Sequence, residues 1–219
     1  MNRKLLFGSV AGALLLGFVA AVMWYQNQRS EARNTLAEAA QSALYRAGAP
    51  IKGSLEAKVT IVEFLDPACE TCREFYPLVS RLLDLYPGKV RLMVRYAPLH
   101  SGSDQVVRML EAAHRQGKFW QALERLFGNQ ERWVVNHSAQ PQRALAALST
   151  LGLNQQQFSS DRDSPEVAQV VQQDIRDGQT LAVRATPEFF VNGHPLPSFG
   201  YEQLSILVKE AVNTAYGVQ

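Results

Sequence analysis

The chain has 219 residues, of which 47% are hydrophobic and 19% are charged, and its formal net charge is +2. It has no basic stripe, internal repeat or low-complexity tract, so nucleic acid is not expected as a partner. Beyond an apolar N-terminal segment, the remainder is long enough for one domain with a sizeable core, or for a small domain with an insertion.

The N-terminus has the pattern of a membrane anchor. Arg3 and Lys4 precede an uncharged and mostly apolar run over residues 5–25. About twenty residues at a rise of 1.5 Å cover the roughly 30 Å core of a bilayer. The basic pair should stay cytoplasmic, and Trp24 and Tyr25 would lie at the outer interface. We expect a single-pass protein of the inner (cytoplasmic) membrane, with its folded domain in the periplasm or another extracytoplasmic space.

Two alternatives to an anchor exist for this segment. Val19, Ala20 and Ala21 are small residues of the kind found at signal-peptide cleavage sites. We favour the anchor because the apolar run continues past that site, and export follows under either interpretation. A buried core helix is disfavoured because the run is apolar all round and terminal. Export would place the protein where disulfides form and persist.

The next segments predict a strand, helix, strand unit. An amphipathic helix is expected over residues 30–47, followed by a break at Gly48 and Pro50. The run VTIVEFL, residues 59–65, is typical of a strand buried on both faces. A helix should follow over residues 70–86, and residues 90–96 should form a second strand parallel to the first.

The second half of the chain is expected to begin with helices. Helical spacing recurs in four stretches between residues 104 and 181, which are residues 104–116, 118–127, 141–151 and 165–181, and no strand signal interrupts them. Strand character returns at residues 188–191, where Asn192-Gly193 is a strong hairpin signal. A final helix is predicted over residues 201–215.

The two cysteines of the chain, Cys69 and Cys72, form a CxxC pair between the first strand and the following helix. A helix N-terminus favours an anion, so the pKa of Cys69 should fall below the usual 8.5. Cys69 would then be the exposed, attacking thiol. Cys72, one turn inside the helix, would be the shielded thiol that resolves a mixed disulfide.

The CxxC pair has two alternative roles. A zinc site needs further Cys or His pairs, whereas the histidines of this chain are scattered singly. A structural disulfide across so short a loop would constrain the unfolded chain little. We therefore expect no metal site, and no cofactor other than the redox-active disulfide Cys69–Cys72.

Glu63 and Pro187 are two further candidate site residues. Glu63 is an acid in an apolar strand that leads to the cysteines, and it is a candidate proton acceptor for Cys72. The alternative is that Glu63 lies on a face that reaches solvent. Thr186-Pro187 precedes the strand at residues 188–191, and this proline is either an edge residue or a cis-proline.

Three segments in order resemble the DsbA-like thiol:disulfide oxidoreductases of the thioredoxin superfamily. VTIVEFLDPACETC is similar to their first core strand and active-site turn, and AAHRQGKFWQALERLF, residues 112–127, to part of their helical insertion. RATPEFFVNGHPL, residues 184–196, resembles the loop that carries their cis-proline. The resemblance covers roughly residues 48–216.

The resemblance implies roles for individual residues. Cys69 would attack, Cys72 would resolve, Glu63 would be the buried acid, and Pro187 a cis-proline facing the disulfide. Thr186 would offer its backbone to an extended substrate segment. Glu70 and Thr71, between the cysteines, are also expected to meet the substrate.

The implied fold class is α/β, a thioredoxin-like fold with an inserted helical domain, preceded by an N-terminal transmembrane helix. The expected boundaries are an anchor at residues 1–25, a helical linker at 26–50, the first part of the thioredoxin-like domain at 51–100, the insertion at 101–182 and the second part of the domain at 183–219.

Two departures from the family pattern bear on the direction of electron flow. Strongly oxidising members usually carry a histidine between the cysteines, where this chain has Glu70-Thr71, and Glu188 follows the proline where a small polar residue is more usual. Negative charge near Cys69 should hold its pKa nearer neutral and make the disulfide less oxidising.

We expect an extracytoplasmic oxidoreductase that exchanges disulfides with protein substrates and with a membrane redox partner of unknown identity. One alternative is a reductase or isomerase kept reduced by a membrane donor. Another is a module that binds copper(I) through the two thiolates, with Met93 approaching from the neighbouring strand.

Overall fold

The computed structural model describes residues 23–28, 31, 35 and 38–217. The chain divides into two units, residues 1–42 and residues 43–219, and every described residue of the first unit is helical. Within the described ranges, no helix combines the length and apolar character needed to cross a membrane. The expected anchor over residues 1–25 lies outside the described residues except for its last three.

The second unit is built on a mixed sheet with the strand order β1-β3-β2-β6-β7. The strands are β1 (Ile51–Lys52), β2 (Val59–Leu65), β3 (Val90–Tyr96), β6 (Glu188–Val191) and β7 (His194–Pro195). As predicted, β2 and β3 are parallel, and β6 and β7 form an antiparallel hairpin. All seven residues of β2 are buried, which agrees with its continuous apolar sequence.

The two faces of the sheet carry separate apolar clusters. Ile61 and Leu65 of β2 face helices α2 (Glu70–Leu85) and α9 (Tyr201–Tyr216). Val62 and Phe64, on the opposite face, belong to a smaller cluster. Because side chains alternate along a strand, Glu63 points to the same side as Ile61 and Leu65, toward α2.

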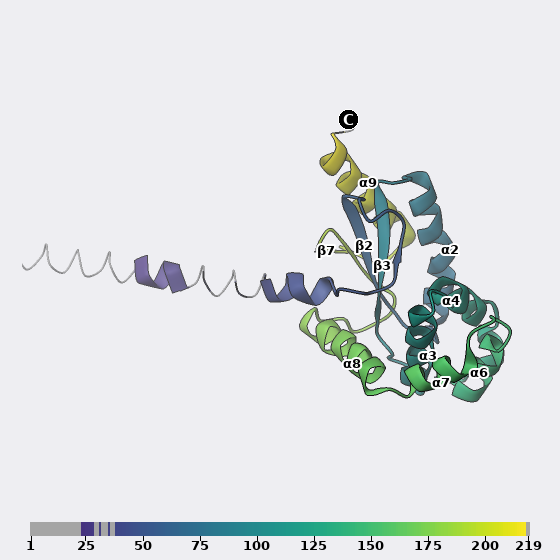
Figure 1. Ribbon diagram of the computed structural model, residues 1–219. Coiled ribbons are helices and arrows are strands. Elements are labelled where there is room, and N and C mark those ends of the chain that lie inside the picture. Colours follow the sequence, from purple (N-terminus) through teal and green to yellow (C-terminus); the bar gives the residue numbers. More distant parts are fainter. Residues whose placement is uncertain (1–22, 29–30, 32–34, 36–37, 218–219) are drawn as a thin grey trace, which may run out of the picture. The chain divides into compact units, whose positions relative to one another are not determined.

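Helix α8 (Pro165–Thr180) packs against β3, away from α2 and α9 (Figure 1). Its buried Asp174 accepts hydrogen bonds from Nε of Arg95 at 2.8 Å, from Nε of Arg46 at 2.7 Å and from the backbone N–H of Tyr96 at 2.9 Å. A fully buried arginine is stable in such a place only when its donors are paired. This network fixes α8 to the sheet.

The helical segment between β3 and α8 lies beyond one end of the strands (Figure 1). It contains α3 (Ser103–Arg115), α4 (Phe119–Gly128), α5 (Gln130–Trp133), α6 (Pro141–Leu148) and α7 (Gln155–Arg162). The expected helices are confirmed to within a few residues, although α6 ends three residues before the predicted bound.

Several short elements depart from the sequence prediction. The expectation that no strand interrupts residues 104–181 is wrong, because β4 (Val134–Val135) and β5 (Ser138–Ala139) form a short hairpin. Helix α7 was not predicted, because Phe158 is its one buried residue and the rest is polar. Strand β1 has only two residues, too few to show a period.

Candidate active site

Cys69 occupies the N-cap of α2, as predicted. Its backbone is extended, with φ −75° and ψ 122°, and the helix begins at the next residue. The Cys69 thiol donates a hydrogen bond to the carbonyl oxygen of Thr186, with Sγ and O 3.1 Å apart. The peptide bond between Thr186 and Pro187 is cis, as the resemblance implied. The fold therefore brings the active-site turn and the cis-proline loop together.

Cys69 is more enclosed than the sequence suggested, with only 6% of its surface exposed. The Thr186 loop lies against its sulfur, and this contact joins two segments that are 117 residues apart in the chain. The spacing of the cysteines alone does not predict this contact between Cys69 and Thr186. The cis-proline loop therefore covers part of the Cys69 thiol.

The surroundings of Cys69 favour its thiolate. Hydrogen bonds from the Cys72 thiol, the Thr186 side chain and the backbone N–H groups of Thr71 and Cys72 lower the pKa of Cys69 to about 6, although burial opposes this shift. The backbone donors are the unpaired N–H groups of the first helical turn. The predicted lowering below 8.5 is confirmed, and the pKa lies near neutrality.

Cys72 has the opposite environment. It is completely buried in the apolar cluster under α2. Burial raises the pKa of Cys72 well above its usual value, and its hydrogen bond to Cys69 and the charge of Glu63 act in the same direction. Two thiols three residues apart thus differ in the way that a nucleophile and a resolving thiol require.

Glu63 is buried and faces the dithiol. It has no exposed surface, and neither carboxylate oxygen has a hydrogen-bond partner among the described residues. Burial, with a smaller contribution from Cys69, raises the pKa of Glu63 to about 8. The alternative that this side chain reaches solvent is wrong. A carboxyl group with this pKa can both accept and return a proton near pH 7.

Two polar side chains that the sequence analysis did not single out hold the active-site turn. The buried Asp66 accepts hydrogen bonds from the backbone N–H of Ala68 at 2.8 Å, from that of Leu99 at 2.8 Å and from that of His100 at 2.9 Å. Ser103 also donates its hydroxyl to Asp66. Sequence shows Asp66 only as a polar residue that ends a strand, so its hydrogen bonds could not be predicted.

Gln130, in the short helix α5, is the second of these side chains. Its Nε2 donates to the carbonyl oxygens of Pro67 at 2.9 Å and Cys69 at 3.0 Å. It thereby ties the helical segment to the turn that carries the nucleophile. A signal for this role is absent from the local sequence because Gln130 is 61 residues from Cys69.

The acids expected to oppose ionisation of Cys69 do not decide its pKa. Glu70 is partly exposed, and its Oε1 lies 3.4 Å from Nδ1 of His137. Burial raises the pKa of Glu188. Neither Glu70 nor Glu188 is among the groups that shift the pKa of Cys69. Thr71, also expected near the substrate, is partly exposed and contributes its backbone N–H to Cys69.

Met93 does not approach the cysteines. It belongs to the apolar cluster on one face of the sheet, whereas Cys69 and Cys72 belong to the cluster on the other. The expectation that Met93 is a copper ligand is therefore wrong. Side chains alternate along β3, and residue 93 points away from the dithiol.

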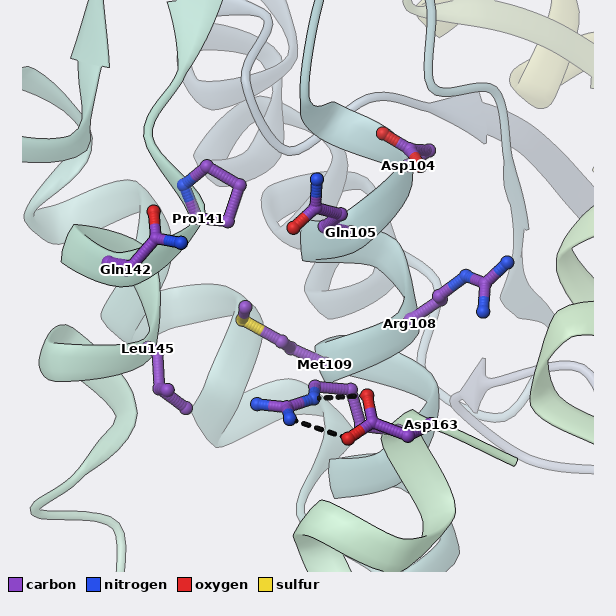
Figure 2. Close-up of a pocket in the computed structure, with 9 residues that line it drawn as sticks. Asp104, Gln105, Arg108, Met109, Pro141, Gln142, Leu145 and Asp163 are labelled. Atoms are coloured by element: carbon purple, nitrogen blue, oxygen red, sulfur yellow. Dashed lines mark hydrogen bonds and ion pairs between the residues drawn. The ribbon is translucent and has the colours of Figure 1, made fainter.

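A pocket of about 270 Å³ opens elsewhere, between α3, α6 and α7 (Figure 2). Arg108, Arg162 and Asp163 line it, and Arg162 and Asp163 pair with each other at 2.7 Å. Its lining contains none of the candidate site residues. We assign it no role in the chemistry of the dithiol.

A thioredoxin-like fold with a CxxC pair at a helix N-terminus, opposite a cis-proline, defines a class of thiol-active proteins. The comparisons agree. The family model described as Thioredoxin matches residues 45–210, so the chain belongs to this family. The chain also resembles the DsbA-like thiol oxidoreductases within it, as the sequence motifs indicated.

Solved structures resemble most of the chain. A thioredoxin-like oxidoreductase from Silicibacter pomeroyi DSS-3 is 32% identical, covers 81% of this chain and 98% of that chain, and has a TM-score of 0.67. BdbD from Bacillus subtilis is 22% identical, covers 76% of this chain and 94% of that chain, and has a TM-score of 0.66. The second likeness shows the fold alone.

Curated relatives match by sequence over part of their length. A Na(+)/H(+) antiporter NhaA of Herminiimonas arsenicoxydans is 32% identical over 146 residues, which are 67% of this chain. NhaA 3 of Salinispora tropica is 32% identical over 170 residues, which are 75% of this chain. The chain spans only 22% and 25% of the length of these two relatives.

Proposed function

We propose that this protein is a thiol:disulfide oxidoreductase that exchanges disulfides with protein substrates through Cys69 and Cys72. The observation that carries the proposal is the difference in pKa between the two thiols at the N-terminus of α2. The pKa of Cys69 is lowered to about 6, whereas that of the buried Cys72 is raised. Only the first thiol is substantially ionised at neutral pH, so Cys69 is the attacking sulfur.

The exchange proceeds in two steps. The Cys69 thiolate attacks a substrate disulfide, so that one S–S bond breaks, a mixed disulfide forms and one substrate sulfur leaves as a thiolate. Glu63 then accepts the proton of Cys72, whose sulfur attacks Sγ of Cys69, so that the mixed disulfide breaks and the second substrate sulfur leaves as a thiolate. The products are the Cys69–Cys72 disulfide and a substrate reduced by two electrons. The reverse sequence oxidises a substrate dithiol.

The position of the loop at Thr186 is evidence that the substrate is a protein. Its carbonyl oxygen lies 3.1 Å from Sγ of Cys69, in the segment that immediately precedes β6. An extended peptide could pair with this backbone while its own sulfur replaces the thiol as the neighbour of Cys69. We place Thr186, Glu70 and Thr71 on the substrate side of the site.

The direction of net electron flow follows from the reduction potential. A pKa near 6 lies between the values of thioredoxin, about 7, and of DsbA, about 3.5. We therefore expect a potential between about −270 mV and about −120 mV. A reductase or isomerase kept reduced by a membrane donor is the second candidate, because a site of intermediate potential can serve either direction.

We also propose an extracytoplasmic, membrane-tethered location, which rests on Arg3, Lys4 and the apolar run that follows them. A membrane redox partner would then restore the oxidised or reduced form after each cycle. The full chain should stay with carbonate-washed membranes, and protease added to spheroplasts should digest it. A full chain that is protected from this protease would contradict the proposed orientation.

Disulfide transfer to and from a peptide tests the enzymatic proposal. The oxidised protein should convert a peptide dithiol to its disulfide, and the reduced protein should reverse this reaction, as followed by mass spectrometry. The double variant Cys69→Ser, Cys72→Ser should do neither. Transfer by this double variant at the wild-type rate, or no transfer by the wild type in either direction, would overturn the proposal.

A further inference from the structure

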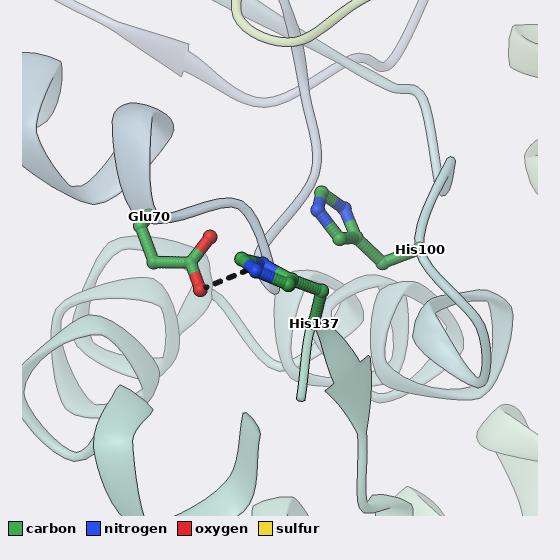
Figure 3. Close-up of side chains that lie close together, drawn as sticks. All are labelled: Glu70, His100 and His137. Atoms are coloured by element: carbon green, nitrogen blue, oxygen red, sulfur yellow. Dashed lines mark ion pairs between the residues drawn. The ribbon is translucent and has the colours of Figure 1, made fainter. Parts of the chain in front are cut away.

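Three potential metal ligands meet beside the active-site turn, although they come from distant segments. Glu70 begins α2, His100 lies in the loop after β3, and His137 lies at the tip of the β4–β5 hairpin (Figure 3). One ligand atom from each lies within 4.8 Å of the other two. Figure 3 shows the imidazole of His137 directed at the Glu70 carboxylate, with the His100 ring close by.

His100 is already oriented as metal-binding histidines are. Its Nδ1 lies 2.8 Å from Oδ2 of the buried Asp66. A hydrogen bond from Nδ1–H to this carboxylate leaves the lone pair of Nε2 free for an ion. A carboxylate behind a histidine in this way fixes the ring and increases its basicity toward a metal.

The segments that carry the ligands are held against one another. The backbone N–H of Ala139, in the hairpin, donates to the carbonyl oxygen of Ser101 at 2.8 Å, next to His100. Gln130, just before the hairpin, bonds to the carbonyl oxygen of Cys69 at 3.0 Å, next to Glu70. The backbone segments that carry the three ligands are therefore connected to one another by hydrogen bonds.

His137 adopts an uncommon backbone conformation, with φ +57° in the left-handed region. Asn136 before it has φ +50°, so both belong to a two-residue hairpin turn in which glycine is usually preferred at the second position. A histidine there is tolerated but disfavoured relative to glycine. This turn places the imidazole of His137 at the mouth of the site.

We propose that Glu70, His100 and His137 form a binding site for a divalent transition-metal ion such as Zn²⁺, one residue from the nucleophilic Cys69. Two imidazoles and a carboxylate suit zinc, and three protein ligands leave one position open. A tetrahedral zinc ion holds its ligand atoms about 3.3 Å apart. The side chains of His137 and Glu70 are 80% and 43% exposed, so they are free to close the remaining gap.

No metal site was expected, because the histidines are scattered along the chain. The fold brings two of them together with Glu70, and this site needs neither cysteine. The inference therefore does not depend on the proposed thiol exchange. Its test is made on a full chain that lacks both thiols, so that failure of one proposal is not failure of the other.

The experiment is a zinc titration of the full-length Cys69→Ser, Cys72→Ser chain in competition with a chromophoric chelator. One Zn²⁺ should bind per chain. Adding His137→Ala should weaken binding at least tenfold, and so should adding His100→Ala. Replacing His194, an exposed histidine on β7 outside the cluster, by alanine should leave the affinity unchanged.

His100 is bonded to the buried Asp66, so its variant also tests the stability of the turn. For this reason the decisive variant is His137→Ala, because His137 is exposed. Circular dichroism checks that this variant is folded. Absence of stoichiometric zinc binding by the thiol-free chain would overturn the proposal. An affinity unchanged by His137→Ala would do the same, since the zinc would then be bound elsewhere.

Discussion

The Sγ atom of Cys69 lies 3.1 Å from the carbonyl oxygen of Thr186, the residue that forms a cis peptide bond with Pro187. This contact adds to the pairing of β2 with β6, which joins the two parts of the thioredoxin-like domain. It also means that the nucleophile and the backbone that would bind a substrate are neighbours before any substrate arrives. Preorganisation of this kind lowers the entropic cost of forming the mixed disulfide.

The Thr186 side chain helps to set the pKa of Cys69. A hydrogen bond to a charged group contributes about 1.5 kcal/mol or more, and one pKa unit corresponds to about 1.4 kcal/mol. The substitution Thr186→Val keeps the shape and removes the hydroxyl, so it should raise the pKa of Cys69 from about 6 to about 7. Thiolate absorbance against pH measures this value.

The matched control for this prediction is Thr180→Val. Thr180 is exposed at the end of α8, and its hydroxyl bonds to the carbonyl oxygen of Arg176. It should leave the pKa of Cys69 unchanged. A wild-type pKa near 3.5, or one near 8.5, would show that the hydrogen bonds described for Cys69 are misjudged.

The buried Glu63 should destabilise the folded protein at neutral pH. Its pKa is raised from 4.5 to about 8, so the folded state keeps a proton that the unfolded chain releases between these values. Stability therefore falls as pH rises from 4.5 to 8. At about 1.4 kcal/mol per pH unit, the interval from about pH 4.5 to pH 7 removes about 3 kcal/mol. Glu63→Gln should recover this amount at pH 7.

Urea unfolding of the reduced protein at two pH values checks this sign. The gain in the free energy of unfolding of Glu63→Gln over the wild type should be near zero at about pH 4 and largest above about pH 8. A variant that is less stable than the wild type at pH 7 would indicate that the Glu63 carboxylate is ionised and paired.

The same residue should accelerate the resolving step. Without a proton acceptor, the buried Cys72 rarely reaches the thiolate form, so Glu63→Gln should slow the release of a mixed disulfide by about 100-fold at pH 7. The attack of Cys69 should change far less. Stopped-flow or quenched-flow mass spectrometry separates the two steps, and Glu56→Gln, at an exposed position, is the control. Equal release rates in the wild type, Glu63→Gln and Glu56→Gln would show that Glu63 does not assist the resolving step.

Asp174 should matter for folding rather than for chemistry. It is fully buried and bonds to two arginines and to the backbone of β3. Asp174→Ala leaves the buried Arg95 without one of its partners, which should lower the free energy of unfolding by about 3 to 5 kcal/mol. Asp163→Ala removes a largely exposed ion pair and should cost about 1 kcal/mol or less. Comparable losses in the two variants would contradict this account.

Local pattern was sufficient to predict the scaffold of the site. The apolar run of β2, the helical spacing of α2 and the Asn192-Gly193 turn are signals carried by neighbouring residues, so their elements were predicted nearly in place. The position of Cys69 at the start of α2 follows directly from that order.

Features that depend on contacts between distant segments were not predictable in this way. Asp66 and Gln130 are ordinary polar residues in the sequence, and their roles arise from bonds made across the fold. The meeting of His100 and His137 depends on the β4–β5 hairpin, whose strands have two residues each and show no period. The burial of Cys69 likewise follows from a loop more than a hundred residues away.

The most direct test of the central claim is to trap the mixed disulfide and locate its sulfur. The Cys72→Ser chain, incubated with a disulfide-bonded peptide, should accumulate a one-to-one covalent adduct that peptide mapping places on Cys69. The Cys69→Ser chain should form almost none, because the remaining thiol is buried and its pKa is raised. Adducts that form as readily on Cys72 as on Cys69, or on neither, would contradict the assignment of Cys69 as the nucleophile.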